Sequence, residues 1–233
     1  MKISAVIPSL NAAHHLPACL EALDGVDEIV VVDGGSIDST RSYARQVGAR
    51  FIEAPRGRGT QLASGAEAAR GEILLFVHAD TRLSPGWLQL ARLHVGRSTR
   101  PACFRLRLDD PAWQARVIER GVALRTRLLG LAYGDQGLLI RRDVYARSGG
   151  FRPLAMLEDV DLLRRIERPM MLDAEALTSA ERWRRDGWGR RSLRNLACIS
   201  LWRLGVSPDR IAALYEPRRP ISPSQRDHVD PVE

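Results

Sequence analysis

Short apolar runs alternate with stretches of helical periodicity through the first hundred residues of the chain. Each apolar run is long enough for one strand and carries few polar residues, which is typical of parallel strands covered on both faces. The runs cover residues 3–9, 27–35, 50–55 and 72–80, and the helical stretches cover residues 12–25, 36–49, 59–71 and 84–96. In the last stretch, Ser84 is the expected N-cap and Pro85 the first helical residue. This repetition predicts an α/β fold with a doubly wound, mainly parallel sheet flanked by helices.

The second half of the chain has a less regular pattern. Residues 102–110 alternate between apolar and polar, as a half-exposed strand does. The other expected elements are a long helix at 111–131, a loop, strand, short helix and glycine turn over 134–151, a helix at 157–168, and two helices at 188–205 and 207–216. The pattern therefore predicts a mixed sheet with a C-terminal helical annex. We expect a single domain over residues 1–216, with the annex at about 181–216, and a flexible tail at 217–233, which is rich in proline and charge.

The composition is that of a globular protein, with 233 residues of which 45% are hydrophobic. Cys19, Cys103 and Cys198 form no CxxC pair, which disfavours a thiolate zinc site and indicates a reducing compartment. The N-terminal apolar run is cut by Pro8 and lacks the features of a signal peptide, and no run reaches the roughly 20 apolar residues of a membrane span. We therefore expect a cytoplasmic protein.

The chain is strongly basic, with a formal net charge of +7, and Lys2 is its only lysine among many arginines. This excess favours anionic partners such as nucleotides, phosphates or an acidic membrane surface. Residues 189–205 intersperse leucines among arginines. A basic amphipathic helix of this kind can lie at the inner face of a membrane, pack on the sheet, or contact a second copy in a homo-oligomer, and the sequence leaves these alternatives open.

Polar residues and glycines follow all four apolar runs. In an open parallel sheet the carboxyl ends of the strands meet at one rim, where ligands bind. The candidates are Pro8, Ser9 and Asn11 after the first run, Asp33 and Gly35 after the second, Arg58 and Gln61 after the third, and His78, Ala79 and Asp80 after the fourth. The first turn, PSLNAAHH, has no glycine and no GxxxxGK[ST] motif occurs, so a dinucleotide-binding Rossmann enzyme or a Walker-loop enzyme is disfavoured.

Two of these positions, and Asp38 just beyond the second run, also have structural explanations. Asp33 follows four apolar residues and is placed to accept a hydrogen bond from a base or a ribose, which we favour over the alternative that it closes an Asp-Gly-Gly turn. Asp38 is as well suited to cap a helix as to bind a ligand, and Gln61 could cap the helix in which it lies.

Several segments together resemble the family 2 glycosyltransferases, which have the GT-A fold. AVIPSLN and EIVVVDGGSIDST resemble the opening of the family, and GRGTQLASGAEAARGEILLFVHADT resembles its central block. YGDQGLLIRRDVYARSGGF and LEDVDLLRRI resemble its later motifs, and HAD and GDQG are most similar to a small bacterial branch of soluble family members. The resemblance spans about residues 3–168. It implies a nucleotide-binding half at about 1–95, an acceptor half at about 96–180, and an inverting, hexosyltransferase-type enzyme that uses a nucleoside-diphosphate sugar, with UDP favoured by family habit.

The resemblance also implies a divalent metal, which in this family is held by an Asp-x-Asp motif and neutralises the departing diphosphate. His78-Ala79-Asp80 stands in the place of that motif. Asp80 is then the principal ligand to Mn²⁺ or Mg²⁺, and His78 is the second, on the same side of the strand. A neutral imidazole suits Mn²⁺ better than Mg²⁺. The alternative for His78 is a hydrogen bond to the donor ribose or to a neighbouring loop.

The remaining roles follow from the same resemblance. Asp33 would accept from the nucleobase, and the other nucleotide- and donor-binding residues would be Pro8, Ser9, Asn11, Gly35, Arg58, Gln61, Ala79 and Asp80. Inverting transfer needs a base for the acceptor hydroxyl, and the acid pair in LEDVDLL implies Asp159 as that base, with Glu158 contacting the donor or acceptor. Asp135 and Gln136 would contact the acceptor or donor sugar. The alternatives are favourable acids in the first turn of a helix for the pair, and a plain turn for GDQG.

The sequence disfavours two alternatives to a glycosyltransferase. A sugar-phosphate nucleotidyltransferase would carry a glycine-rich basic loop after the first strand, where SLNAAHH stands. A non-catalytic nucleotide- or nucleic-acid-binding protein would use the +7 charge, but carboxylates at the rim would repel phosphates, so we expect no nucleic-acid partner. The sequence does not identify the acceptor, which could be a lipid, a glycan or a small molecule.

Overall fold

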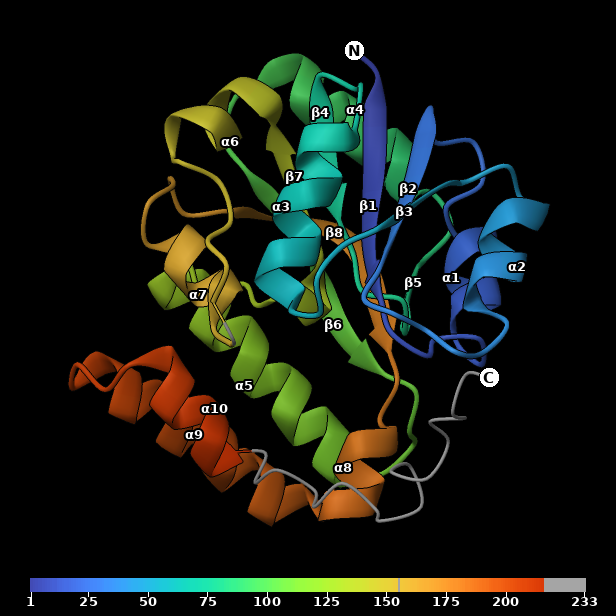
Figure 1. Ribbon diagram of the computed structural model, residues 1–233. Coiled ribbons are helices and arrows are strands. Elements are labelled where there is room, and N and C mark those ends of the chain that lie inside the picture. Colours follow the sequence, from blue (N-terminus) through green and yellow to red (C-terminus); the bar gives the residue numbers. More distant parts are fainter. Residues whose placement is uncertain (155, 216–233) are drawn as a thin grey trace, which may run out of the picture.

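The computed structural model describes residues 1–154 and 156–215. Within these residues, one mixed sheet of eight strands has helices on both faces (Figure 1). The strands are β1 (Ile3–Ser9), β2 (Glu28–Asp33), β3 (Arg50–Glu53), β4 (Ile73–Phe76), β5 (Thr81–Leu83), β6 (Ala102–Leu108), β7 (Leu138–Arg141) and β8 (Met170–Thr178), in the order β3-β2-β1-β4-β7-β6-β8-β5.

Parallel pairing dominates the N-terminal part of the sheet. β1 pairs in parallel with β2 and β4, and β2 pairs in parallel with β3, so the carboxyl ends of these four strands share one rim. β7 lies antiparallel between β4 and β6, β8 pairs in parallel with β6, and β5 pairs antiparallel with β8. The predicted class, a mainly parallel but mixed sheet flanked by helices, is confirmed.

Ten α-helices and one 3₁₀ helix surround the sheet within the described residues. They are α1 (Leu16–Glu21), α2 (Thr40–Gln46), α3 (Arg58–Ala68), α4 (Trp87–Arg97), α5 (Trp113–Leu129), η1 (Gly134–Gln136), α6 (Arg142–Arg147), α7 (Glu158–Leu163), α8 (Glu181–Asp186), α9 (Trp188–Arg203) and α10 (Pro208–Tyr215). The last three helices form the predicted C-terminal annex (Figure 1).

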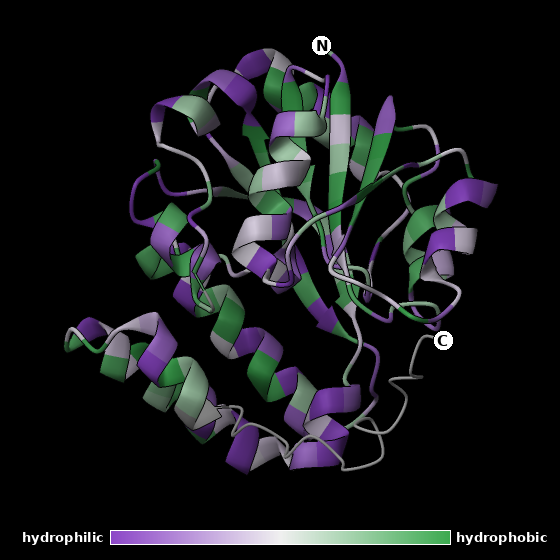
Figure 2. Ribbon diagram, viewed as in Figure 1, coloured by the Kyte–Doolittle hydropathy of each residue, from purple (hydrophilic) through white to green (hydrophobic). Residues whose placement is uncertain are grey.

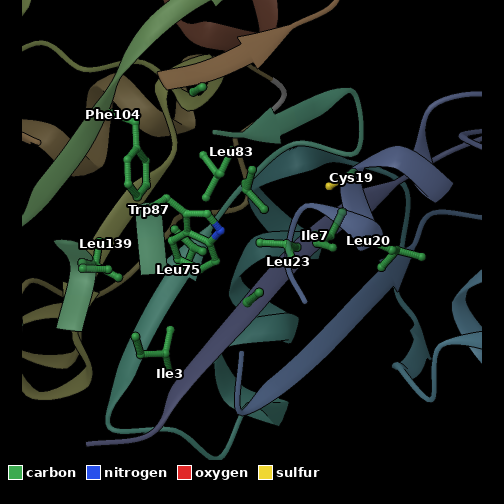
Figure 3. Close-up of a cluster of buried hydrophobic side chains, with 14 of the residues drawn as sticks. Ile3, Ile7, Cys19, Leu20, Leu23, Leu75, Leu83, Trp87, Phe104 and Leu139 are labelled. Atoms are coloured by element: carbon green, nitrogen blue, oxygen red, sulfur yellow. The ribbon is translucent and has the colours of Figure 1, made fainter. Parts of the chain in front are cut away.

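The side chains of each central strand alternate between two hydrophobic cores. On one face, Ile7 of β1 packs with Leu20 of α1 and with Trp87 of α4 (Figure 3). On the other face, Val6 packs with Leu62 of α3. Because successive strand residues point to opposite faces, a strand covered by helices on both sides must be apolar throughout, and this explains why these strands could be recognised as unbroken apolar runs.

β5, β8 and α8 were not predicted. β8 has the sequence MMLDAEALT, in which methionine, alanine and glutamate favour helix over strand. It is a strand because it pairs with β6, from Ala102↔Met170 to Leu108↔Thr178. β5 has only three residues and depends on β8 for its pairing. Tertiary pairing therefore outweighs local propensity here.

The expected start of α4 was wrong. The helix begins at Trp87 with Gly86 in the N-cap position, and Ser84 is not its cap. The hydroxyl of Ser84 instead accepts the backbone N–H of Glu175 in β8, at 2.9 Å. The side chain expected to cap a helix thus joins a loop to β8, a strand that the sequence pattern does not predict.

We expect Gly65→Ala to destabilise the protein, because α3 packs closely on the sheet at this point. A Cβ at residue 65 would lie 2.3 Å from Cγ1 of Val6 and 2.7 Å from Cγ2 of Val32. Overpacking of this kind costs about 1–3 kcal/mol, measurable as the free energy of unfolding in urea. Gly96→Ala in α4 is the control: its Cβ would meet nothing within 4 Å, so it should stabilise by about 0.4–1 kcal/mol. Equal effects of the two substitutions would contradict the close packing of α3.

No helix among the described residues is both long and apolar enough to cross a membrane. The flexible tail expected at 217–233 lies outside the described residues.

Candidate functional site

Charged residues from separate segments meet beyond the carboxyl ends of β1, β2 and β4, at the lower edge of these strands in Figure 1. At their centre is Arg58, the first residue of α3. The side chain is only partly buried; this partial burial acts to lower the pKa of its guanidinium, but four surrounding carboxylates more than offset the effect. They belong to Glu158, Asp159, Asp80 and Asp135. The structure thus brings the predicted metal ligand, the acid pair and the GDQG aspartate around one arginine.

Arg58 and Glu158 form an ion pair across the rim. Nη1 of Arg58 lies 3.3 Å from Oε1 of Glu158, whose side chain is almost completely buried. Burial raises the pKa of Glu158, and Arg58 opposes that rise. Gly59 allows the close approach, since a Cβ there would lie 2.2 Å from the carbonyl oxygen of Arg152. The pair therefore holds the N-termini of α3 and α7 together at the site.

Asp159 is held in a fixed orientation beside this pair. Its Oδ2 accepts the backbone N–H of Gly134 at 2.8 Å, and its Oδ1 accepts the N–H of Val160 at 2.7 Å. Leu157, two residues before Asp159, has a φ of 62°, a left-handed conformation that a bulky side chain rarely adopts and that is strained. Because a carboxylate can accept about four hydrogen bonds, both oxygens keep capacity to accept a proton from a ligand.

Asp80 and Asp135 each have one buried oxygen without a partner. Among the described residues, neither Oδ1 atom receives a hydrogen bond. A hydrogen-bonded link joins the two segments: Oγ1 of Thr178 donates to the carbonyl oxygen of Asp135 at 3.1 Å and lies 2.9 Å from Oγ1 of Thr81. The carbonyl oxygen of Asp80 accepts the N–H of Ser179 at 3.2 Å. The β5–β8 pair therefore places two unsatisfied carboxylates at one site.

Burial raises the pKa of Asp135 to about 6, and the charges of Asp159 and Asp80 add to this rise against the opposing effect of Arg125. A carboxyl whose pKa is higher in the folded than in the unfolded chain binds its proton more tightly when folded. Folding stability contributed by this group is therefore complete below about pH 4 and lost as the pH rises through 6. The site holds a charge that destabilises the fold at neutral pH.

We therefore expect Asp135→Asn, in metal-free buffer, to raise the free energy of unfolding at pH 8 by about 1–3 kcal/mol and to leave it unchanged at pH 4. Urea unfolding followed by tryptophan fluorescence at both pH values measures this. Asp143→Asn is the control, because its hydrogen bonds to Arg141 and Arg147 lower the pKa of Asp143, so that change should not stabilise at pH 8. If Asp135→Asn changed the free energy of unfolding equally at both pH values, folding would not raise the pKa of Asp135.

His78 is a neutral imidazole packed against the 3₁₀ turn. A Cβ on Gly134 would lie 2.5 Å from Nε2 of His78, so only glycine fits there without a shift. Burial and the nearby charge of Arg58 lower the pKa of His78 to about 4, although Asp80 and Asp159 act in the opposite direction. A neutral ring is compatible with both roles expected for it, metal ligation and hydrogen bonding.

The loop after β2 is closed by Asp33. Its buried carboxylate accepts the N–H groups of Gly35 at 3.0 Å and Ser36 at 2.7 Å, and the hydroxyl of Ser9 at 3.1 Å. The turn-closing alternative is thus realised in the structure. The predicted contact between Asp33 and a nucleobase stays a prediction. For that contact, the carboxylate would have to accept a hydrogen bond from the base in addition to those from Ser9, Gly35 and Ser36.

Asn11 braces this loop from the neighbouring strand end. Its backbone N–H donates to Oγ of Ser36 at 2.7 Å, and its Oδ1 accepts the N–H of Ile37 at 3.0 Å, with a φ of 48° at Asn11. Asp38, which precedes the N-cap residue Ser39 of α2, accepts the backbone N–H groups of Thr40 and Ala13, each at 3.0 Å. The side chains of this rim are therefore interlocked around the exposed Gly35.

Both candidate glutamines satisfy main-chain groups. Nε2 of Gln61 donates to the carbonyl oxygens of Ser9 and Val32, each at 2.8 Å, so Gln61 ties β1 to β2 and does not cap α3. Nε2 of Gln136 donates to the carbonyl oxygen of Phe104 at 3.1 Å, and Gln136 has no exposed surface. Pro8 is half-buried at the end of β1, and Ala79 points into the core on the α1 side.

A cavity of about 370 Å³ adjoins Asp80. Its walls include His15 from the loop after β1, Arg82 of β5 and Glu181 of α8. His15 Nε2 lies 3.3 Å from Oε2 of Glu181, so the wall joins the first turn to the annex. These residues were not singled out from the sequence, since no local pattern indicates that residues 15 and 181 meet.

Comparison with known proteins agrees with this geometry. Residues 4–100 match the sequence model of the family described as glycosyl transferase family 2. The resemblance is therefore confirmed for this part of the chain, which includes β1 to β4 and Asp80.

Two curated relatives extend the comparison. The chain is 34% identical over 197 residues to an uncharacterised protein of Mycobacterium tuberculosis, covering 70% of this chain and 61% of that protein. It is 38% identical over 91 residues to a PGL/p-HBAD biosynthesis glycosyltransferase of Mycobacterium bovis, covering 34% of this chain and 36% of that enzyme. The chain thus spans less than two thirds of the length of either relative.

The structure is similar to that of glucosyl-3-phosphoglycerate synthase from Mycobacterium tuberculosis. The complex of that enzyme with Mn²⁺, UDP and glucosyl-3-phosphoglycerate superposes with a TM-score of 0.53 at 19% identity, over 76% of this chain and 70% of the enzyme. The fold is GT-A. The complex of the same enzyme with Mg²⁺ and UDP gives the same TM-score at 20% identity, over 76% of this chain and 69% of the enzyme. At this level of identity, the similarity concerns the GT-A fold.

Proposed function

We propose that this GT-A protein is an inverting glycosyltransferase that moves a hexosyl group from a nucleoside-diphosphate sugar, with UDP favoured, to an acceptor hydroxyl. The observation that carries the proposal is the pair of buried, unpartnered carboxylate oxygens of Asp80 and Asp135, beside Asp159 and Arg58. Uncompensated buried carboxylates are costly, so their presence at a rim that binds ligands supports a catalytic role. The family match over residues 4–100 supports the same class of reaction.

The donor set fits a divalent cation that is bound together with its substrate. No group of three or more His, Cys, Asp or Glu side chains within the described residues could hold a metal alone. Mg²⁺ characteristically uses one or two carboxylates, with water and substrate phosphates completing its shell. Asp80 and Asp135 would supply those carboxylates, and His78 could add a nitrogen if the ion is Mn²⁺. When bound, the ion would neutralise charge on the departing diphosphate.

Asp159 is proposed as the general base. As the acceptor oxygen bonds to the anomeric carbon, its proton passes to a carboxylate oxygen of Asp159, and the bond between that carbon and the diphosphate oxygen breaks with its electron pair on the nucleotide. The hydrogen bonds from Gly134 and Val160 orient the carboxylate.

Arg58 would contribute positive charge to the donor side of the reaction. Its ion pair with Glu158 fixes the guanidinium while leaving the side chain 42% exposed. An oriented arginine in that position can donate to diphosphate oxygens. The interlocked loop containing Ser9, Asn11 and Asp33 would form the floor of the nucleotide site, with Gly35 providing an exposed backbone.

Donor hydrolysis tests the reaction class without knowledge of the acceptor. The protein is incubated with Mn²⁺ and a panel of UDP- and GDP-sugars, and released nucleoside diphosphate and free sugar are quantified by chromatography. The proposal expects slow release of UDP from one or a few UDP-sugars. Formation of nucleotide sugar from a nucleoside triphosphate and a sugar 1-phosphate, with no hydrolysis of any donor, would identify a nucleotidyltransferase and overturn it.

A further inference from the structure

Two neighbouring helices leave apolar strips exposed. On α5, four apolar side chains are more than half exposed: Trp113, Val117, Leu124 and Leu128. On α9 and its C-cap, Leu193, Leu196 and Leu204 are also more than half exposed. Residues spaced by three, four, seven or eight fall on one side of a helix, so each set forms a continuous strip.

α5 and α9 run alongside each other. Trp188, the first residue of α9, packs against the cluster that contains Ala115 and Val122 of α5. At the other end of α9, Arg203 is close enough to Tyr133, just beyond α5, to lower the pKa of the Tyr133 hydroxyl, which burial raises. Figure 1 shows the two helices at the same end of the molecule, and Figure 2 shows green apolar and purple polar bands along both.

The charge beside these strips is positive. The exposed residues Arg120, Arg127, Arg190 and Arg203 flank them, and none forms an ion pair with a carboxylate within the described residues. α9 contains no aspartate or glutamate, and the one acid of α5, Glu119, is buried and paired with Arg107 and Arg116. We define the arginine–leucine face as the two apolar strips together with these four arginines.

We propose that the arginine–leucine face docks the protein onto an anionic membrane surface. Apolar side chains at the centre of the face would enter the boundary between headgroups and acyl chains, and the flanking arginines would contact acidic headgroups. Arginine suits this place because its apolar stem can lie in the boundary while its guanidinium stays at the phosphates. A second copy of the chain is a poor occupant, since a two-fold contact would bring like-charged arginines together.

The position of the face relative to the site gives it a functional consequence. The charge of Arg203 on α9 lowers the pKa of Tyr133, and the guanidinium of Arg125 lies over the Tyr133 ring. Asp135 follows Tyr133 by two residues. Docking would therefore bring the acceptor side of the site close to the bilayer surface. This consequence rests on the proposed transfer reaction, whereas docking itself does not.

Vesicle flotation tests the docking with the full chain. Vesicles of phosphatidylcholine with added phosphatidylglycerol should bind the protein, pure phosphatidylcholine should bind it weakly, and added salt should release it. Each arginine near an anionic surface contributes about fivefold to partitioning, so Arg190→Gln/Arg203→Gln should weaken binding about 25-fold. Leu193→Ser/Leu196→Ser should weaken it at least tenfold.

The matched control is Leu93→Ser/Arg97→Gln on α4, which changes one exposed leucine and one exposed arginine on another helix. It should bind vesicles as the unchanged protein does. The proposal is overturned if anionic vesicles do not bind the protein, if the control loses binding as the test variants do, or if the leucine variant instead abolishes a dimer seen by light scattering. Donor hydrolysis is measured without vesicles and does not depend on docking. Failure of the hydrolysis test would therefore count against the proposed reaction, and failure of flotation against the docking.

Discussion

Asp159→Asn is expected to reduce sugar transfer or donor hydrolysis by about 10²–10⁴-fold while leaving UDP affinity within about twofold. The amide cannot take up the acceptor proton. Asparagine has one acceptor oxygen, so it can keep the hydrogen bond from Gly134 or that from Val160, but not both. A stability loss of about 1 kcal/mol should follow, and rates are therefore compared at a temperature where both proteins are folded.

Asp173→Asn is the control for that experiment, since Asp173 is 88% exposed on β8. It should change neither the rate nor the affinity. Transfer by Asp159→Asn at more than a tenth of the original rate would remove Asp159 from the role of base. Asp135, whose pKa burial raises to about 6, would then be the carboxylate to test next.

Asp80→Asn is expected to abolish the effect of Mn²⁺ on UDP binding. The Oδ1 atom of Asp80 has no hydrogen-bond partner among the described residues, so the carboxylate charge is available to a cation. The amide keeps the shape but loses the charge, which should cost at least about tenfold in the UDP affinity measured with Mn²⁺ and a similar factor in turnover. Titration of UDP in the presence and absence of Mn²⁺ measures the first quantity.

His78→Asn provides the comparison for the metal site. If the ring is a ligand, this change should weaken Mn²⁺-dependent binding more than Mg²⁺-dependent binding. If the ring only forms hydrogen bonds, both ions should support UDP binding equally. An Asp80→Asn protein that still bound UDP more tightly with Mn²⁺ than without it would contradict the assignment of Asp80, whatever the result at His78.

The first four strands and the rim could be predicted because they follow from local patterns. An apolar run such as residues 72–80 must be a strand covered on both faces, and parallel strands bring the residues after them to one edge. Asp80, Arg58 and the acid pair are therefore found together, as expected from the sequence and the resemblance.

The other features depend on contacts between distant segments, which no local pattern encodes. Asp135 meets Asp80 through the pairing of β5 with β8, two strands that were not predicted. The sequence suggests Gln61 and Gln136 as ligand-binding amides, but in the structure their Nε2 atoms donate hydrogen bonds to main-chain carbonyl oxygens of the strands. A buried polar side chain needs such partners, and only the folded chain shows whether they come from the protein or from a ligand.

Calorimetric titration of UDP into the protein, with and without Mn²⁺, tests the central claim most directly. A nucleotide-sugar site that uses a cation held by Asp80 and Asp135 predicts micromolar UDP binding that is at least tenfold tighter with Mn²⁺ and insensitive to the metal in Asp80→Asn. No binding of UDP or GDP under either condition would contradict the account.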